Sequence, residues 1–343
     1  MSAFLDACRG VAGPRHVPVW FMRQAGRSLP EYRAIRGVGS ILDAIKKPDL
    51  ATEITLQPVR RYGVDAAIVY SDIVVPVHAI GFGVDIAPGV GPVVEQPFAS
   101  RNDLERLRPL DAAADVPYVI ETVRNLSREL KVPLIGFAGA PFTVASYLIE
   151  GRPSRTYAKT KALMHGDSDL WFDLMDRLAD LAIAFLDAQI DAGAAAVQLF
   201  DSWAGALHAG DYQKFVMPAS TRVLQHARSK GVPTIHFGVH TGELLTLMRD
   251  AGADVVGVDW RTHLDDARRT LGDGVTLQGN LDPAIVLAPW DVVATEVRDV
   301  LARNDGNPRH IFNLGHGVLP ETDPSILERV VELVHREGIV RDN

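Results

Sequence analysis

The sequence contains a single cysteine, Cys8, among its 343 residues. An internal disulfide needs two cysteines and a thiolate metal cluster needs several, so both are excluded. No apolar run reaches the roughly 20 residues that a membrane-spanning helix requires. The segment from Met1 to Arg15 also lacks the basic and apolar regions of a secretory signal. We therefore expect a cytoplasmic protein without a membrane segment.

Positive charge is also scarce in this chain. There are 35 lysines and arginines against 43 aspartates and glutamates, which gives a formal net charge of −8 at pH 7. A protein that binds nucleic acid needs a basic surface to neutralise phosphates, so we expect no nucleic-acid partner. An anionic small molecule could still bind, provided that a local cluster of basic residues attracts it.

Short runs of almost entirely apolar residues recur along the chain, and each ends in polar residues or glycine. Such runs are typical of parallel strands that are buried on both faces. There are eight of them, at 17–21, 66–70, 133–137, 196–200, 233–237, 255–259, 276–280 and 310–314. Amphipathic segments that indicate helices include 169–192, 241–251 and 324–336. The alternation predicts a (β/α)₈ TIM barrel, formed as a single domain over residues 1–343.

Residues 73–99 interrupt the alternation. The segment is rich in glycine and proline, which predicts a loop or hairpin inserted after the second strand. A doubly wound sheet is the alternative fold, but it would need a Gly-x-Gly-x-x-Gly turn after the first strand. The sequence at 25–27 is Ala-Gly-Arg, and Gly-Phe-Gly at 81–83 lacks the third glycine. The barrel is therefore the better interpretation.

In a TIM barrel, polar residues that follow the carboxyl ends of the strands line the active site. Applied to the predicted strands, this rule selects Arg23, Arg27, Asp72, Ser202 and His316. Four separate segments would thus bring arginine, carboxylate, hydroxyl and imidazole groups to one rim. The arginines indicate a ligand with carboxylates, because a guanidinium fork binds a carboxylate through two parallel hydrogen bonds.

Each of these residues also has a purely structural interpretation. The two arginines are spaced like neighbours on a solvent-exposed helix face. Asp72 and Ser202 could cap the helices that follow their strands, and His316 could be a buried core histidine. His236 and His240 lack His-Glu-x-x-His spacing and a cysteine partner, so we expect no metal there.

Several motifs resemble segments of a known family. Residues 18–27, Pro-Val-Trp-Phe-Met-Arg-Gln-Ala-Gly-Arg, continued at 29–33, resemble the N-terminal motif of uroporphyrinogen decarboxylases. Residues 136–143, Gly-Phe-Ala-Gly-Ala-Pro-Phe-Thr, resemble the second motif of that family. Four further segments, in the order of the family, are Tyr-Ser-Asp-Ile at 70–73, Phe-Asp-Ser-Trp-Ala-Gly at 200–205, Gln-Gly-Asn-Leu-Asp-Pro at 278–283 and Asn-Leu-Gly-His-Gly at 313–317. The resemblance thus covers nearly the whole chain.

The resemblance implies a (β/α)₈ barrel, usually a homodimer, that converts uroporphyrinogen III to coproporphyrinogen III by removing four acetate carboxyl groups. It also implies that the reaction needs neither a metal nor an organic cofactor. By position, the functional residues of the family fall on Arg23, Arg27, Arg36, Asp72, Tyr147, Ser202 and His316.

The implied substrate carries eight carboxylates, which fits a local group of arginines in an acidic protein. Loss of CO₂ needs an electron sink, and a pyrrole protonated at a ring carbon can serve as one. We expect Asp72 to accept pyrrole N–H bonds and to stabilise the developing positive charge. Arg23 and Arg27 would complete the catalytic group as carboxylate clamps, because a pKa above about 12 makes arginine a poor acid. The proton donor stays open between Arg27 and a bound water.

Two other functions fit parts of the pattern. Methyltransferases of the methylcobamide type resemble this family, but they hold zinc through histidine and cysteine thiolates, and Cys8 lies before the first predicted strand. A noncatalytic tetrapyrrole carrier would need the arginines but not Asp72. Substitution of Asp72 therefore separates a carrier from an enzyme.

Overall fold

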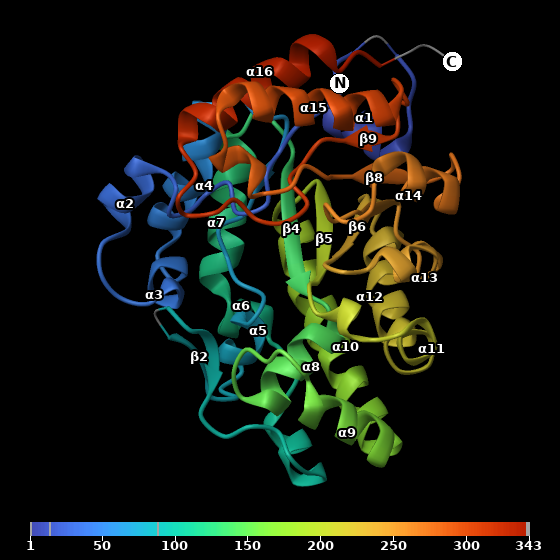
Figure 1. The fold of residues 1–343 in the computed structure, drawn as a ribbon. Coiled ribbons are helices and arrows are strands. Elements are labelled where there is room, and N and C mark those ends of the chain that lie inside the picture. The colour runs from blue at the N-terminus through green and yellow to red at the C-terminus, as the bar shows by residue number, and fades with distance from the viewer. Residues whose placement is uncertain (1, 14, 88, 341–343) are drawn as a thin grey trace.

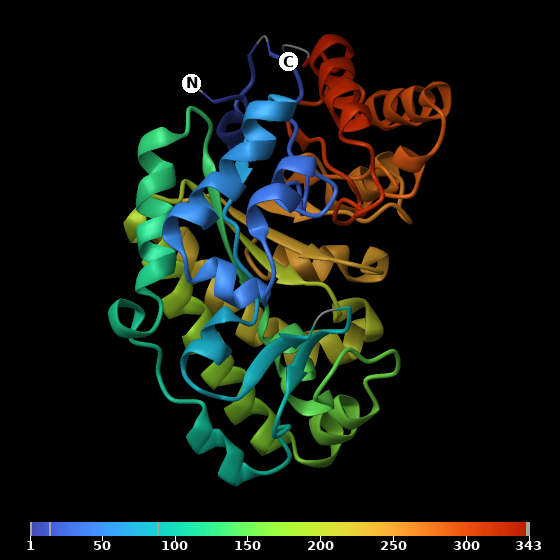
Figure 2. The same cartoon turned by 90° about the vertical axis from the view of Figure 1, so that its left-hand side faces the viewer.

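The computed structural model describes residues 2–13, 15–87 and 89–340 (Figure 1). Seven strands of this part of the chain form a parallel sheet in the order β1-β4-β5-β6-β7-β8-β9. Their bounds are Ala67–Ile68, Leu134–Gly139, Ala196–Asp201, Thr234–Gly238, Val255–Gly257, Thr276–Gln278 and His310–Ile311. Because neighbours in the sheet follow one another along the chain, each crossover carries helices and the sheet curls into a TIM-barrel-like fold (Figures 1 and 2).

Helices cover the outer face of the curled sheet (Figure 2). The longer ones are α4 (Pro48–Tyr62), α7 (Pro117–Glu129), α8 (Pro141–Glu150), α10 (Ser168–Ala192), α12 (Met217–Ser229), α15 (Trp290–Asn304) and α16 (Pro324–Glu337). Four of them begin with proline, whose fixed φ suits the first helical turn, where its missing N–H costs no bond. Gly63 ends α4 with a φ of 66°, a left-handed conformation that favours glycine.

The segment 17–21, expected as the first strand, forms a single parallel bridge between Val19 and Phe312. The Phe312 N–H donates to the Pro18 carbonyl at 2.8 Å, and the Trp20 N–H donates to the Phe312 carbonyl at 3.3 Å. On the other side, the Asp65 N–H donates to the Val19 carbonyl at 2.7 Å. Regular pairing is short because Pro18 has no N–H to donate. The segment nevertheless lies between β9 and the residues that lead into β1.

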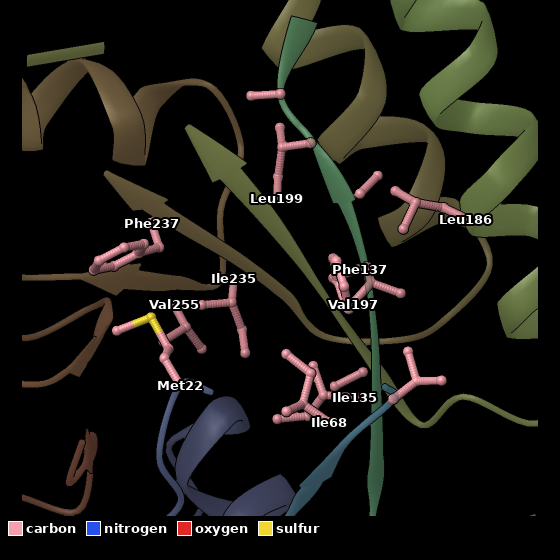
Figure 3. Packing of buried hydrophobic residues seen from close by; sticks show 14 of the residues in the cluster. Met22, Ile68, Ile135, Phe137, Leu186, Val197, Leu199, Ile235, Phe237 and Val255 are labelled. Atoms are coloured by element: carbon pink, nitrogen blue, oxygen red, sulfur yellow. The ribbon is translucent and has the colours of Figure 1, made fainter. Parts of the chain in front are cut away.

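Polar side chains meet across the inside of the curled sheet. The indole N–H of Trp20 donates to Gln278 Oε1 at 3.0 Å, and Gln278 Nε2 donates to Gln198 Oε1 at 2.9 Å. Gln278 belongs to β8 and Gln198 to β5, with two strands between them in the sheet. The contact therefore crosses the interior. Apolar side chains of β4, β5, β6 and β7 fill the rest of the core and pack against Met22 and Leu186 (Figure 3).

Residues 73–99 contain helix α5 (Val75–Ala79) and the antiparallel strands β2 (Val84–Ala87) and β3 (Gly91–Val94). Pro88, between the two strands, lies outside the described residues. The Val94 N–H donates to the Gly151 carbonyl at 2.9 Å, which joins the segment to the end of α8. Since α8 follows β4, the segment lies beyond the carboxyl ends of the sheet strands. That it is an insertion into a barrel stays a prediction.

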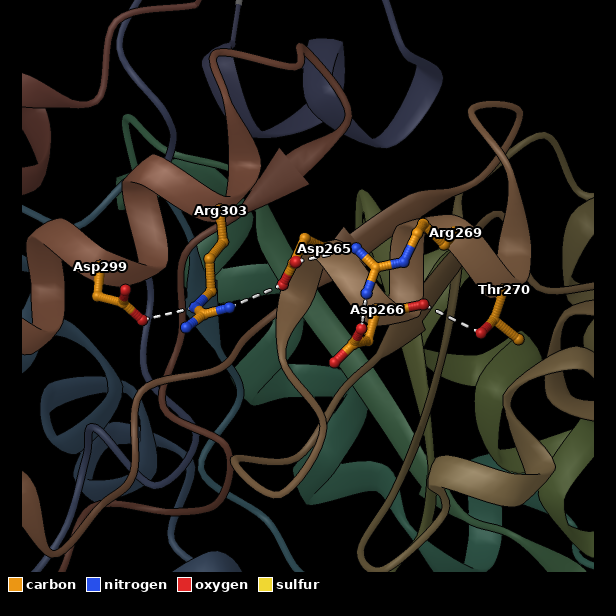
Figure 4. A network of polar contacts seen from close by, with 6 residues as sticks. All are labelled: Asp265, Asp266, Arg269, Thr270, Asp299 and Arg303. Atoms are coloured by element: carbon orange, nitrogen blue, oxygen red, sulfur yellow. Dashed lines mark hydrogen bonds and ion pairs between the residues drawn. The ribbon is translucent and has the colours of Figure 1, made fainter.

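Charged side chains join α14 (Leu264–Leu271) to α15 on the outer surface (Figure 4). Arg303 of α15 contacts Asp265 of α14 at 3.0 Å and Asp299 at 2.6 Å. Arg269 pairs with Asp265 and Asp266 within α14. Exposed pairs of this kind contribute about 0–1 kcal/mol each, so the apolar faces of the helices supply most of the stability.

The two ends of the described chain meet at the amino-terminal end of the strands. The Val17 N–H donates to the Gly338 carbonyl at 2.6 Å, and the Val340 N–H donates to the Arg15 carbonyl at 3.0 Å. Helices α1 (Ala3–Arg9) and α16 lie at this end in Figure 1. Among the described residues, no helix has both the length and the apolar character needed to cross a membrane.

Candidate active site

The predicted site residues come from five segments that follow strands or the 17–21 segment. Arg23 and Arg27 follow residues 17–21, and Arg36 ends helix α2 (Pro30–Arg36). Asp72 follows β1, and Tyr147 lies in α8 after β4. Ser202 directly follows β5, and His316 follows β9. All of these segments lie on the side of the sheet where TIM-barrel enzymes hold their active sites.

Asp72 begins the turn that leads into α5. Its carboxylate Oδ1 accepts the N–H of Val74 at 3.0 Å, and its carbonyl accepts the N–H of Val75 at 3.2 Å. The bond to Val74 belongs to the turn before α5, whose N-cap is Val74 without a side-chain cap, so Asp72 does not cap the helix. A carboxylate has about four acceptor sites and can bind further N–H donors. The pKa of Asp72 is raised overall, because burial outweighs the lowering effects of the Val74 N–H and of the positive charge of Arg23.

Arg23 has a φ of 60°, which is uncommon for a residue other than glycine. Its side chain runs over Gly317, where an added Cβ would lie 2.7 Å from Arg23 Cγ. The glycine therefore leaves the space that the arginine needs. The charge of Arg23 lowers the pKa of both Asp72 and His316, so one guanidinium acts on both groups.

His316 is half-buried and lies near the Phe237 ring, with 6.3 Å between the ring centroids. Burial, together with the charges of Arg23 and Arg261, lowers the pKa of His316 to about 4, although Asp259 raises it. The imidazole is thus neutral near pH 7 and can donate and accept hydrogen bonds. A cavity of about 330 Å³ on this face is lined by residues that include Asp259, Arg261 and His240.

Aromatic rings form one wall of the site. Tyr147 stacks at a tilt on Trp203, with 3.9 Å between centroids, and Tyr157 lies 5.1 Å from the same ring. Burial and the charge of Asp72 raise the pKa of Tyr147, so its hydroxyl keeps its proton and can donate it in a hydrogen bond. Ser202 lies beside Trp203 and is half-buried. Among the described residues its hydroxyl caps no helix, which leaves it available to a ligand.

The three predicted arginines have no carboxylate partner within the part of the chain that the structure describes. Arg23 and Arg27 are exposed, and no ion pair involves either of them or Arg36. Arg36 donates to the Gly37 carbonyl at 3.1 Å. Burial raises the pKa of the nearby Tyr70 hydroxyl, and Arg36 opposes part of that rise. Arg23 thus lies with Asp72, Tyr147 and His316. In the described residues, no hydrogen bond or ion pair joins Arg27 or Arg36 to that group.

Comparison with known proteins identifies the family. A model of the family "Uroporphyrinogen decarboxylase (URO-D)" matches residues 1–337. The uroporphyrinogen decarboxylase of Salinispora tropica is 63% identical over 335 residues, which cover 97% of this chain and 90% of that protein. The uroporphyrinogen decarboxylase of Streptomyces avermitilis is 60% identical over 337 residues, which cover 98% of this chain and 94% of that protein. The chain belongs to the uroporphyrinogen decarboxylase family.

The resemblance read from the motifs is therefore confirmed. Among solved structures, a methyltransferase from Methanosarcina mazei has a TM-score of 0.78 at 19% identity, with 97% of both chains covered. At this level of identity the likeness shows that the uroporphyrinogen decarboxylase family and this methyltransferase share a fold.

Beneath the site of this family member lies a buried polar layer that the sequence did not reveal. Asp201 Oδ1 accepts the hydroxyl of Thr143 at 2.8 Å, and Asp201 Oδ2 lies 3.7 Å from His236 Nε2. Asp201 Oδ2, both ring nitrogens of His236 and the hydroxyl of Tyr212 are buried without a hydrogen-bond partner in the described residues. Buried polar atoms of this kind are usual sites for internal water.

One signal could have pointed to this layer. Asp201 and His236 are polar residues within or at the end of otherwise apolar strands. His236 faces Asp201, whereas the backbone N–H of His240 donates to Asp259 Oδ2 at 2.6 Å. In the described chain, neither histidine belongs to a group of side chains spaced to bind a metal ion.

Proposed function

We propose that the chain removes the carboxyl groups of the four acetate side chains of uroporphyrinogen III and releases coproporphyrinogen III. The support from comparison is that relatives named uroporphyrinogen decarboxylase are 60% identical or more over at least 97% of the chain. The observation that carries the proposal is the environment of Asp72, a carboxylate whose pKa responds to Arg23 and whose charge acts on Tyr147.

Substrate binding follows from the free arginines. The substrate has eight carboxylates, so the net charge of −8 would repel it unless cations without partners face it. Arg23 and Arg27 are exposed and free of ion pairs in the described chain, so they can bind carboxylates without first breaking a salt bridge. Arg36 would bind a further substrate carboxylate farther from Asp72.

Asp72 would hold the pyrrole rings through their N–H groups at the centre of the macrocycle. Protonation of a pyrrole carbon next to an acetate makes a cation, and the C–C bond to the carboxylate then breaks so that its electron pair enters the ring. CO₂ leaves, a proton adds to the exocyclic carbon to form the methyl group, and the ring loses the first proton. The fixed negative charge of Asp72 stabilises the cation, an effect worth about 3 kcal/mol for one preorganised group.

The other residues would orient the substrate. Neutral His316 and the protonated hydroxyl of Tyr147 can donate hydrogen bonds to carboxylates, and Ser202 can do the same. Trp203 and Tyr147 would supply an apolar surface for a flat part of the macrocycle. Because the electrons stay in the pyrrole, these roles call for neither a metal nor an organic cofactor.

The proposal also covers the complete barrel fold and the domain organisation. The bonds of residues 18–20 to Phe312 and of Val19 to Asp65 support closure into a (β/α)₈ barrel, with one domain over residues 1–343. We also propose a carboxy-lyase that works as a homodimer in the cytoplasm. The net charge of −8 supports the absence of a nucleic-acid partner.

The rival functions are less well supported. Cys8 is buried in α1, next to Ala7, whose carbonyl accepts the hydroxyl of Thr276 at the start of β8. The thiol therefore lies at the opposite end of the strands from Asp72, and burial raises its pKa. It is thus in the wrong place to ligate zinc beside the candidate site, as a methyltransferase would require. A carrier would have no use for the charge of Asp72.

The test is incubation of purified, metal-stripped protein with uroporphyrinogen III under anaerobic conditions, followed by oxidation and separation of the porphyrins by carboxylate number. We expect products with seven, six, five and four carboxylates without added cofactor. Recovery of only the eight-carboxylate species from protein that binds it would favour a carrier. Neither binding nor product would contradict the proposed substrate.

A further inference from the structure

Two histidines and an aspartate converge at the amino-terminal end of the strands, away from the candidate active site. His16 Nε2 lies 2.8 Å from Asp65 Oδ1, and His335 Nε2 lies 2.8 Å from Asp65 Oδ2. The two imidazole rings are 4.0 Å apart between centroids. His16 precedes the 17–21 segment, Asp65 precedes β1 and His335 lies in the last turns of α16. Three separate parts of the chain thus place potential ligand atoms at one point.

We propose that His16, Asp65 and His335 bind a divalent transition-metal ion of the zinc type. One ligand atom from each side chain lies within 4.8 Å of the other two. Zinc bonds of about 2.0–2.2 Å in a tetrahedral site place neighbouring ligand atoms roughly 3.4 Å apart. The nitrogen-to-oxygen distances therefore need to open by only about half an ångström. Two imidazoles among three ligands favour zinc-like ions over Mg²⁺ or Ca²⁺, which prefer oxygen.

The surroundings hold the carboxylate in place and leave it accessible. The Val19 N–H donates to Asp65 Oδ2 at 2.7 Å, and the Asp65 N–H donates to the Val19 carbonyl at 2.7 Å. Such bonds from the backbone orient a metal ligand. The side chains of His16, Asp65 and His335 are 34%, 15% and 29% exposed, so an ion and a water ligand can reach them.

The charge of the group also suits a dication. Burial raises the pKa of Asp65, but the two histidines lower it to about 2, so the carboxylate is ionised near neutral pH. With neutral imidazoles the group carries one negative charge. In the metal-free protein each Nε2–H donates to the carboxylate. On metal binding each imidazole keeps one proton by moving it to Nδ1, and Nε2 then offers its lone pair to the ion.

A second group of two histidines and an aspartate lies elsewhere in the chain, but one of its histidines has no nitrogen lone pair to offer a metal ion. His165 Nε2 and His208 Nε2 lie 3.2 and 3.3 Å from the same oxygen, Asp211 Oδ2. His208 Nδ1 accepts the N–H of Gly210 at 3.1 Å, which fixes the proton of the neutral ring on Nε2. That nitrogen has no lone pair for a metal, so His208 serves as a matched control.

A metal at this site would link the beginning of the chain to its last helix. Because binding favours the folded state by mass action, the ion would raise stability. The site lies at the opposite end of the strands from Asp72, so we expect decarboxylation to be unchanged. The inference therefore goes beyond the proposed function, and each can fail without the other.

The experiment uses the full chain, freed of metal by a chelator and dialysed. We expect ZnCl₂ to raise Tm until one ion is bound per chain, and Co²⁺ to give the visible absorption of tetrahedral coordination. His16→Gln and His335→Gln keep an N–H donor to Asp65 but should weaken zinc binding more than about tenfold. His208→Gln should bind zinc like the wild type.

The proposal is overturned if the wild type shows no saturable binding, or if both glutamine variants bind zinc as the wild type does. Loss of binding in His208→Gln alone would also overturn it. Should the glutamine variants fail to fold, zinc X-ray absorption of the wild type decides the question. Two imidazoles in the first shell support the site, and a shell without imidazole contradicts it.

Discussion

Burial and single neighbouring groups shift the pKa of Asp72. Burial raises the pKa of this carboxyl group, and the Val74 N–H and the guanidinium of Arg23 lower it. Arg23 can act on Asp72 because the chain takes up a left-handed φ of 60° there and because Gly317 leaves room for the side chain. The positive charge of Arg23 lowers the pKa of Asp72 against the larger effect of burial, and in the proposed function it would also attract carboxylates of the substrate.

Replacing Arg23 with glutamine should therefore change the pH profile as well as the rate. The positive charge favours the carboxylate form of Asp72, so its removal raises the pKa of that group. We expect the acid limb of kcat/KM to move to higher pH in Arg23→Gln. Arg60→Gln, which makes the same charge change at an exposed Glu53 pair on α4, should leave the limb in place. An unchanged acid limb in Arg23→Gln would contradict the electrostatic role.

A second residue, His310, is predicted to make the fold less stable in acid. His310 in β9 is buried, its Nε2 donates to the Gly279 carbonyl at 2.8 Å, and burial lowers its pKa to about 4. An unfolded histidine titrates near 6.5, so between pH 6.5 and 4 the unfolded chain binds more protons than the folded chain. The free energy of unfolding therefore decreases as the pH is lowered through this range. The loss on acidification is about 3 kcal/mol by the usual conversion.

His310→Gln keeps a donor for Gly279 but cannot take up this proton. In urea unfolding at a series of pH values, the wild type should lose about 3 kcal/mol more than the variant between pH 7 and 4. His316 is present in both proteins and cancels from the comparison. Parallel stability curves for the two proteins would rule out His310 as the source.

Candidate site residues could be predicted from the sequence only where they lie in a family motif or at the end of a predicted strand. Strand ends and motifs selected Arg23, Asp72 and His316, and the structure brings these three together around one guanidinium. Asp201 and His236 were missed as a pair because their proximity depends on the register between β5 and β6. That register comes from packing across the whole sheet, which no local pattern records.

In the loop after β9, two glycines of one motif have different structural roles. A Cβ at Gly315 would lie 3.0 Å from Trp260 Cβ and 3.1 Å from the Asp259 carbonyl carbon. These atoms belong to the backbone or lie next to it, so they cannot easily move. The three atoms nearest to a Cβ at Gly317 all belong to the flexible side chain of Arg23, which can move. Both glycines thus make room for other parts of the protein.

This difference predicts opposite effects of the same substitution. Gly315→Ala should lower the free energy of unfolding by about 1–3 kcal/mol, as overpacking does, and reduce Tm. Gly317→Ala should leave Tm nearly unchanged but raise KM, because it displaces the Arg23 guanidinium. Thermal unfolding and steady-state kinetics of both variants check the prediction. A Gly317→Ala enzyme with normal KM and lowered Tm would contradict it.

Most elements followed from sequence patterns, and the exceptions have local causes. The predicted helix at 169–192 is α10 (Ser168–Ala192), and the strand at 196–200 is β5 (Ala196–Asp201). Residues 17–21 form only one bridge because proline cannot donate a ladder bond. The glycine- and proline-rich segment 73–99 contains helix α5, which is too short to leave a periodic pattern in the sequence.

At the scale of the whole molecule, the assembly state is the next prediction. The family resemblance implies a homodimer, and each chain has a mass of 37.3 kDa. Sedimentation equilibrium should give twice the mass of one chain, and dilution should shift the mass toward that of one chain only at low concentration. A mass of 37.3 kDa at all concentrations would contradict the dimer.

In the proposed reaction, the fixed charge of Asp72 drives decarboxylation of a tetrapyrrole that the arginines hold. Asp72→Asn tests it most directly, because asparagine keeps an acceptor for the Val74 N–H and removes only the charge. Wild type and variant would be compared in one anaerobic assay that measures bound uroporphyrinogen III and the formation of seven-carboxylate product. We expect the variant to bind within a few-fold of wild type and to react more slowly by about 100-fold or more. Near-normal turnover by Asp72→Asn would contradict it.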